Sequence, residues 1–415
     1  MREMKDSGIS WVGEIPKEWS VWRNKYIFKI TKDIVLPSEN YQLLSLTTTG
    51  IKEKDENDNG GKVPENYDGY QIVKENDLVM CLFDLDCSAV FSGLSPYNGM
   101  ISPAYKVLKV KKRIANEQYY RYWFNYVGSK RFYKQYSKSL RFTLNADEFN
   151  RLFSLLPPLA EQQRIAEFLD RACGKIDGLK ADIQAQIDTL EQYKRSVITE
   201  AVTHGLNPSA PMKDSGIPWV GQFPTHWTKK KGKYILRYMS KPVKQDDGVI
   251  TCFRDGEVTL RSNRREDGFT MADKEIGYQG VDVGDLVVHG MDGFAGAIGI
   301  SDSRGKASPV LNVLNTKQNK KYIMYYLRSM AYGDVFTALS TGIRVRSCDL
   351  RWNKLAELLY PLPPIDEQNN IVNYIDEQIA RTNDIIADKK SQIETLDGYK
   401  KSLIYEYVTG KKEVG

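Results

Sequence analysis

The sequence predicts an α+β protein in which two tandem globular α/β domains are separated by two long helices packed as an antiparallel coiled coil. Three observations predict this architecture: an internal repeat, mixed strand and helix patterns in the centre of each repeat, and a long amphipathic segment at the end of each. The length of 415 residues agrees with it, because a chain this long does not form one compact core. Two copies of one unit also predict a pseudo-two-fold internal repeat.

The repeat is defined by three anchor segments that each occur twice. Residues 4–19 read MKDSGISWVGEIPKEW and residues 212–227 read MKDSGIPWVGQFPTHW, an offset of 208. The second pair, LPPLAEQQRI and LPPIDEQNNI, is 206 residues apart, and so is the third pair, YKRSVITEAVTHG and YKKSLIYEYVTG. The centres between these anchors are unlike. We interpret this as one architecture holding two centres with related tasks on different targets; gene duplication with neutral drift is the alternative.

The two centres, about residues 20–156 and 228–362, are expected to be mixed domains. Residues 70–80 and 285–289 are β-rich and lie between turn residues, whereas residues 117–126 and 320–330 have helical periodicity. A length of about 140 residues suits one α+β domain.

Each half ends in a long segment with apolar residues at steps of three and four. About 40 residues at 1.5 Å each predict a helix of roughly 60 Å. Such a helix needs a partner for its apolar seam, and the other copy is the economical one; packing of each helix on its own domain is the alternative. The seam positions are Ile165, Leu169, Ala172, Ile176, Leu179, Ile183, Ile187, Leu190, Val197 and Ala201 in the first segment and Ile371, Ile375, Ile379, Thr382, Ile386, Lys389, Ile393, Leu396, Leu403 and Tyr407 in the second. We therefore predict four parts: a globular domain over 1–156, a helical segment over 157–205, a second globular domain over 206–362 and a second helical segment over 363–415.

Motifs of catalysis are missing from the sequence. It contains no phosphate-binding loop and no H-E-x-x-H, its five cysteines form no C-x-x-C pair, and its three histidines are scattered. Asp84 and Asp292 recur at an offset of 208, and we interpret them as turn-capping carboxylates rather than as an acid–base pair. We expect no catalytic residue, no metal site and no cofactor in this chain. No apolar run approaches bilayer length and no apolar leader opens the chain, so we expect a cytoplasmic protein without a membrane partner.

Basic residues cluster at comparable places in both halves, on a chain of net charge +6. Such clusters neutralise phosphates, and Arg and Asn can also read base edges in the major groove. A solvated basic face is the alternative for any single cluster. The candidate DNA-binding residues are Lys130, Arg131, Lys134, Lys138 and Arg141 in the first half and Arg254, Arg261, Asn263, Arg264, Arg265, Arg344 and Arg346 in the second.

Taken together, these features resemble the specificity subunit of type I restriction–modification enzymes. The resemblance rests on the SGI-x-WVG-x-[IF]-P-x-x-W, [LI]PP-[LI]-x-EQ and YK-[RK]-S-[VL]-I segments, which occur twice and span nearly the whole chain. It implies that the centres are two target recognition domains, each reading one half of a bipartite, asymmetric DNA sequence. It implies that the two helices fix the unspecified gap between the halves.

The same resemblance implies the partners. Two modification subunits would methylate adenine, and restriction subunits would use ATP to translocate and cut DNA. S-adenosylmethionine, ATP and magnesium would belong to those partners, and this chain would be a non-catalytic subunit that is nucleoid-associated when bound to DNA. A methyltransferase-only system, a single-chain enzyme and a protein-only coiled-coil scaffold are the alternatives.

Within the candidate interface we expect two roles. Arg141 and the Arg344/Arg346 pair are expected to read bases. Lys130, Arg131, Lys134, Arg261, Arg264 and Arg265 are expected mainly on phosphates. The tryptophans of the opening segments, Trp11, Trp19, Trp219 and Trp227, are interpreted as packing residues.

Overall fold

The chain folds as two compact units, each of which contains parts of both halves of the sequence. Unit 1 comprises Met1–Ile183 and Ser391–Gly415, and unit 2 comprises Gln184–Lys390. The computed structural model describes residues 2–35, 41–54, 67, 69–264, 275–339 and 350–414. Among these residues no helix is both long enough and apolar enough to cross a bilayer.

The centre of unit 1 is a four-stranded antiparallel sheet with the order β4-β11-β8-β9. Four strand pairs surround it: β1-β2, β5-β6, β10-β7 and β12-β3. The strands are β1 (Met4–Asp6), β2 (Glu14–Pro16), β3 (Ser20–Arg23), β4 (Phe28–Thr31), β5 (Leu44–Thr47), β6 (Gly50–Glu53), β7 (Gln71–Val73), β8 (Leu78–Met80), β9 (Ser92–Leu94), β10 (Gly99–Ile101), β11 (Lys106–Val110) and β12 (Phe153–Leu156).

Unit 2 repeats this topology, because its sheet has the order β16-β23-β20-β21 and is joined by the pairs β13-β14, β15-β24, β17-β18 and β19-β22. The sequence repeat is therefore a structural repeat, as predicted. The strands are β13 (Met212–Asp214), β14 (Gln222–Pro224), β15 (Thr228–Lys231), β16 (Leu236–Tyr238), β17 (Ile250–Cys252), β18 (Val258–Leu260), β19 (Gln279–Val281), β20 (Leu286–His289), β21 (Ile298–Ile300), β22 (Gly305–Ala307), β23 (Leu311–Thr316) and β24 (Leu359–Leu362).

A 13-residue helix covers each sheet: α2 (Glu117–Ser129) in unit 1 and α6 (Lys320–Tyr332) in unit 2. Each begins at an asparagine N-cap, Asn116 or Asn319, whose side chain accepts backbone N–H groups of the first turn. The aromatic face of α2 forms the core of unit 1, where the Phe28 ring lies 4.8 Å from that of Tyr120. The shorter helices are α1 (Asn24–Ile27), α3 (Ala146–Arg151), α5 (Gly232–Ile235), α7 (Val335–Ala338) and α8 (Trp352–Glu357), and the 3-10 helices are η2 (Phe132–Tyr136), η3 (Arg261–Asn263) and η4 (Gly293–Ala295).

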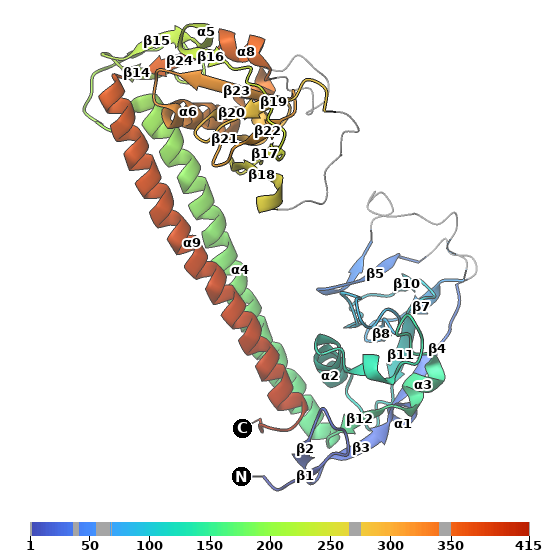
Figure 1. Ribbon diagram of the computed structural model, residues 1–415. Coiled ribbons are helices and arrows are strands. Elements are labelled where there is room, and N and C mark those ends of the chain that lie inside the picture. Colours follow the sequence, from blue (N-terminus) through green and yellow to red (C-terminus); the bar gives the residue numbers. More distant parts are fainter. Residues whose placement is uncertain are drawn as a thin grey trace. The chain divides into compact units, whose positions relative to one another are not determined.

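The two long helices are α4 (Leu159–His204) and α9 (Ile365–Val408), and in each unit a segment of one runs beside a segment of the other (Figure 1). In unit 1 the Lys400 ammonium binds Asp177 at 2.6 Å, and Lys180 pairs with Asp397. In unit 2 the Lys194 ammonium donates to the Asn383 amide oxygen at 2.8 Å. In these contacts, residues further along α4 pair with residues earlier in α9. The two helices are therefore antiparallel, as predicted.

The predicted seam of α4 is wrong at one position. Leu179 is 53% exposed, whereas Lys180 is half-buried and Cys173 is buried. The step from Ile176 to the next inward residue is four rather than three, because an α-helix has 3.6 residues per turn and a strict pattern of steps drifts around it. The Lys180 stem therefore continues the seam, and its ammonium is satisfied by Asp397.

The repeated E-Q dipeptide after the paired prolines locks the opening segment to the long helix. Glu161 accepts from the Trp19 indole N–H at 2.9 Å, and Glu367 accepts from that of Trp227 at 3.0 Å. Both indoles are fully buried. The interpretation of Trp19 and Trp227 as packing residues is confirmed.

The glutamines of the same dipeptides join the start of each long helix to the start of the sheet-covering helix. Gln162 donates to the carbonyl of Pro157 at 2.8 Å and accepts from the N–H of Asn116 at 2.8 Å. Gln368 repeats both contacts with Pro363 at 2.9 Å and Asn319 at 3.0 Å. One dipeptide thus fixes three elements, which explains its presence in both halves.

The third anchor segment of each half closes with a glycine, and this glycine ends the long helix. Gly205 has φ +78° and Gly410 has φ +70°, the left-handed conformation in which glycine ends a helix. A Cβ on Gly410 would lie 2.4 Å from Pro16, so the closing segment of the second half is packed against the opening segment of the first. Tyr119 completes this joint, because its hydroxyl donates to the Val408 carbonyl at 2.9 Å.

Candidate nucleic-acid interface

The basic residues of unit 1 follow the end of α2. Lys130 is the C-cap of α2, and Arg131 has φ +52°, which turns the chain into η2. The Trp11 ring stacks on Phe132 with centroids 4.3 Å apart, and its indole N–H donates to the Tyr136 hydroxyl at 3.1 Å. The opening segment therefore positions the basic turn, and Trp11 is a packing residue as expected.

Three of the five predicted cations of unit 1 line one shallow groove. Lys130, Arg131 and Lys134 gather there around Phe132 and Phe142, in a volume of about 460 Å³. The Lys134 ammonium lies 4.5 Å from the centre of the Phe142 ring, a cation–π geometry that holds the side chain in place.

The five predicted cations of unit 1 make no salt bridge with any residue that the structure describes. Lys138 and Arg141 lie outside the groove, on the exposed loop that follows η2. The whole cluster therefore keeps its positive charge available for an external anion. This set comprises Lys130, Arg131, Lys134, Lys138 and Arg141.

The loop over residues 137–143 is braced by hydrogen bonds at both ends. The Ser137 hydroxyl donates to the Thr143 carbonyl at 2.8 Å, and the Thr143 N–H donates to the Ser139 hydroxyl at 2.7 Å. The Asp84 N–H donates to the Arg141 carbonyl at 3.1 Å, which ties the loop to the turn after β8. Phe142 has φ +45°, a strained conformation for an aromatic residue.

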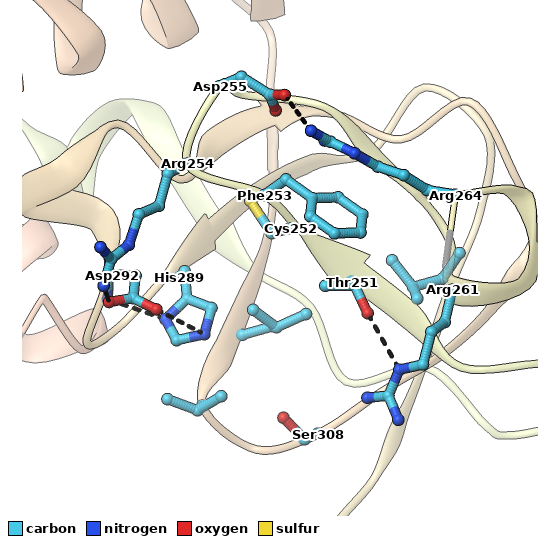
Figure 2. Close-up of a pocket in the computed structure, with 13 residues that line it drawn as sticks. Thr251, Cys252, Phe253, Arg254, Asp255, Arg261, Arg264, His289, Asp292 and Ser308 are labelled. Carbon is cyan, nitrogen blue, oxygen red and sulfur yellow. Dashed lines mark hydrogen bonds and ion pairs between the residues drawn. The ribbon is translucent and has the colours of Figure 1, made fainter. Parts of the chain in front are cut away.

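The basic residues of unit 2 surround a cleft of about 650 Å³. Arg254 lies on one side of it and Arg261 and Arg264 lie on the other, while β17 supplies the wall between them (Figure 2). Arg254 binds Asp292 at 2.9 Å, and Arg264 binds Asp255 at 2.7 Å. These guanidinium groups are oriented by carboxylates, so this site is less positive than the unit 1 cluster.

His289 lies in the same cleft, and sequence reasoning missed it. Its Nδ1 accepts the backbone N–H of Asp292 at 2.9 Å and that of Met291 at 3.2 Å. The ring proton therefore lies on Nε2, and burial lowers the pKa of His289, which keeps the ring neutral at pH 7. The cleft thus holds a fixed N–H donor. Cys81 occupies the matching position in unit 1, where its thiol donates to the Phe83 carbonyl at 3.4 Å.

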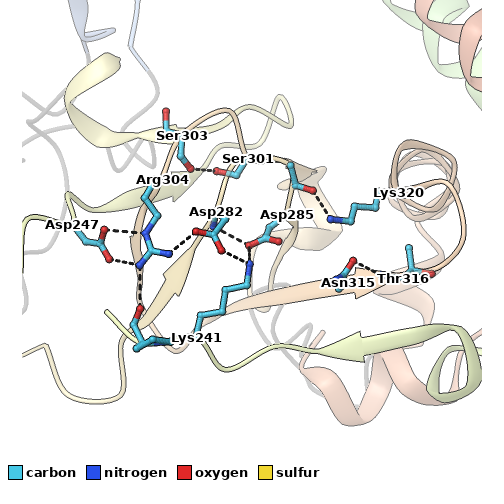
Figure 3. Close-up of polar contacts among 12 residues, drawn as sticks. Lys241, Asp247, Asp282, Asp285, Ser301, Ser303, Arg304, Asn315, Thr316 and Lys320 are labelled. Carbon is cyan, nitrogen blue, oxygen red and sulfur yellow. Dashed lines mark hydrogen bonds and ion pairs between the residues drawn. The ribbon is translucent and has the colours of Figure 1, made fainter. Parts of the chain in front are cut away.

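The side of unit 2 next to the cleft is held by an ion-pair network (Figure 3). Arg304 binds Asp247 through two nitrogens, at 3.0 and 2.8 Å, and binds Asp282 at 2.5 Å. Lys241 joins Asp282 at 2.7 Å to Asp285 at 2.5 Å. These bonds lower the pKa of Asp282 to about 2. Arg304 directly precedes β22, and Ser308, one residue beyond that strand, lines the cleft.

The remaining sequence-based expectations have mixed outcomes. Asn263 does not line the cleft; its amide donates to the Thr259 hydroxyl at 2.9 Å. The turn-capping interpretation of Asp292 is wrong: its carboxylate makes no cap hydrogen bond at η4 and instead binds Arg254. Arg265, Arg344 and Arg346 lie outside the described residues. Among the described residues, no group of three or more His, Cys, Asp or Glu could hold a metal ion.

Solved structures share this architecture. A chain from a structure of a type I restriction–modification system, studied for its complex assembly and conformational transition, matches with a TM-score of 0.68 and 12% identity over 96% of this chain and 99% of its own length. The HsdS subunit from Thermoanaerobacter tengcongensis matches with a TM-score of 0.50 and 13% identity, over 96% and 98% of the two chains. The fold is that of the type I specificity subunits.

The sequence itself is homologous to one such subunit. The MjaX type I restriction enzyme specificity subunit from Methanocaldococcus jannaschii is 22% identical over 97% of this chain and 96% of its own length. No family model matches the sequence. The resemblance inferred from the repeated anchors is confirmed by this full-length similarity.

Proposed function

We propose that this chain is the DNA-recognition subunit of a type I restriction–modification complex and has no catalytic site of its own. The observation that carries the proposal is the contrast between its two units. They share the sheet order and the Trp–Glu and Gln anchors. However, the basic turn of unit 1 makes no salt bridge with a described residue, whereas carboxylates orient the guanidinium groups that line the cleft of unit 2. Two different surfaces on one architecture suit a target with two unlike halves.

Each unit reads one half of an asymmetric DNA sequence in this proposal. In unit 1, Lys130, Arg131 and Lys134 neutralise phosphates and Arg141 reads a base. In unit 2, Arg261 and Arg264 bind the DNA phosphates. Arg254 and His289 donate hydrogen bonds to base edges. Fixed donors favour guanine or thymine oxygen and purine nitrogen acceptors over the cytosine amino group.

The pair formed by α4 and α9 acts as the spacer between the half-sites, and the whole chain is the platform on which two modification subunits and the restriction subunits assemble. Those partner subunits, and not this chain, bind S-adenosylmethionine, ATP and magnesium. The similar sequence and the structural matches support this proposal, because they are specificity subunits or come from the type I system. We place the complex in the cytoplasm, on the chromosome when it is bound to DNA.

Mapping of N6-methyladenine tests this proposal. The chain is co-expressed with its modification subunit in an unmethylated host, and the modified adenines are located across the genome. A single split motif with two unlike halves and a fixed gap supports it. Methylation without sequence preference, or a stable complex that leaves all DNA unmodified, would instead favour a protein-only scaffold.

A further inference from the structure

One feature of the 137–143 loop is unexplained by packing. Leu140, at its tip, is 101% exposed, the highest exposure among the large hydrophobic residues that the structure describes. Its neighbours on the loop, Lys138, Ser139 and Arg141, are exposed as well. A leucine this exposed adds no burial energy to the folded unit, and it presents an apolar tip to a partner.

The loop holds Leu140 in place rather than letting it collapse onto the domain. The Phe142 N–H donates to the Ser139 carbonyl at 3.0 Å, which closes a turn around Leu140. Beyond it, the Leu85 N–H donates to the Phe142 carbonyl at 3.3 Å, and the Leu144 N–H donates to the Leu82 carbonyl at 2.7 Å. The Phe142 ring is also fixed by Lys134. The tip therefore projects from a turn whose base is hydrogen-bonded to the domain.

The charge around the tip indicates what it contacts. Lys138 and Arg141 flank Leu140, neither forms a salt bridge with a described residue, and the Lys130–Lys134 groove lies just before the loop. This arrangement is complementary to DNA, in which phosphates lie on both sides of an apolar base stack. The cations would face the phosphates and the leucine would face the bases. Proteins that bend DNA commonly insert Leu, Ile, Phe or Met between base steps in this way.

We propose that Leu140 is an apolar wedge that enters the DNA at the half-site read by unit 1 and unstacks one base step. Lys138 holds the phosphates beside that step, and Arg141 reads a base next to it. The proposal rests on the proposed function and adds to it a mode of contact that needs no base-specific hydrogen bond. Sequence preference at this step then arises from how easily the step unstacks, which favours pyrimidine–purine steps.

Fluorescence of 2-aminopurine tests the wedge in the intact complex with the modification subunit. The probe is placed in turn at each position of the unit 1 half-site except the methylated adenine, which a methyltransferase extrudes for its own chemistry. We expect a several-fold fluorescence rise at one step with the wild-type complex. Leu140→Ser should abolish that rise and weaken binding about tenfold. Leu140→Met should keep the fluorescence rise and the affinity of the wild type.

Leu179→Ser is the matched control, because Leu179 is an exposed leucine of the same unit on α4. It should leave the fluorescence and the affinity at wild-type values. A Leu140→Ser complex that binds its target with the full fluorescence rise would overturn the wedge and leave the proposed function standing. Loss of the modification subunit from Leu140→Ser on size-exclusion chromatography would overturn it in favour of a protein contact. A wild-type complex without sequence-specific binding would overturn both proposals.

Discussion

Individual cations of the two units differ in how much charge they offer to DNA. Lys134 has a cation–π partner but no described carboxylate, whereas Arg264 shares its charge with Asp255 and Glu257. Counterion release depends on the charge brought to the phosphates. Unit 1 should therefore contribute more than unit 2 to the salt dependence of binding.

Lys134→Ala should weaken binding to all DNA sequences alike and lower the slope of log K against log salt by about 1. The slope is measured by fluorescence anisotropy of the complex on cognate and unrelated duplexes between low and moderate salt. Lys17→Ala, which removes an exposed lysine paired with Glu3 in the same unit, is the control. A slope equal to that of the wild type would remove Lys134 from the phosphate contacts.

The basic residues of the site could be found from the sequence, but their partners could not. Clusters such as Lys130–Arg141 are contiguous, so composition alone identifies them. Arg254 and Asp292 are 38 positions apart, and the fold alone brings them together. His289 gave no signal for the same reason, because its tautomer depends on backbone groups of a turn that the sequence does not specify.

The secondary-structure elements are held together by the repeated anchors, and this was the most predictable part of the fold. Residues repeated with few changes in both halves turn out to be buried joints: Trp19 with Glu161 and Trp227 with Glu367. The seam of the long helices was less predictable. Apolar spacing placed Leu179 inward, although Lys180 fills that place because Asp397 satisfies its charge.

Loss of the indole donor at a joint should destabilise the unit that contains it. Trp19→Phe keeps the aromatic packing but leaves Glu161 with one donor fewer in a buried site, at a cost of about 1–3 kcal/mol in the free energy of unfolding. Trp227→Phe should have a similar effect in unit 2. Urea unfolding followed by circular dichroism measures the change. Trp22→Phe, at a 41% exposed position, should stay within about 0.5 kcal/mol of the wild type. Equal losses of stability at all three sites would contradict a stabilising role for the buried Trp–Glu hydrogen bonds.

The ion-pair network around Arg304 and Asp282 should make the stability of unit 2 depend on pH. The pKa of Asp282 is about 2 in the folded unit and about 4 in an unfolded chain, so the folded state is favoured above pH 4 and loses this advantage as the pH falls toward 2. Arg304→Gln should therefore lower the Tm at pH 7 by more than it does near pH 3. Arg381→Gln removes an exposed pair on α9 of the same unit and is the control. A Tm difference for Arg304→Gln that is constant over this range would contradict the assignment.

At the scale of the whole molecule, the chain is one architecture used twice with two different surfaces. Length, repeat offset and anchor motifs were enough to predict this arrangement, because repetition is visible in a single sequence. The surfaces were not predictable in detail, since the centres diverge where the sites lie. The central claim is that each surface determines one half of the DNA target independently.

The most direct test exchanges residues 20–156 for the corresponding centre of a specificity subunit with a known, different target. The chimera and the wild type are each co-expressed with the modification subunit, and N6-methyladenine is mapped across the host genome. The account predicts that one half of the split motif changes to the donor's half, while the other half and the gap stay the same. A change in both halves, or in neither, would contradict the claim that the two units read DNA separately.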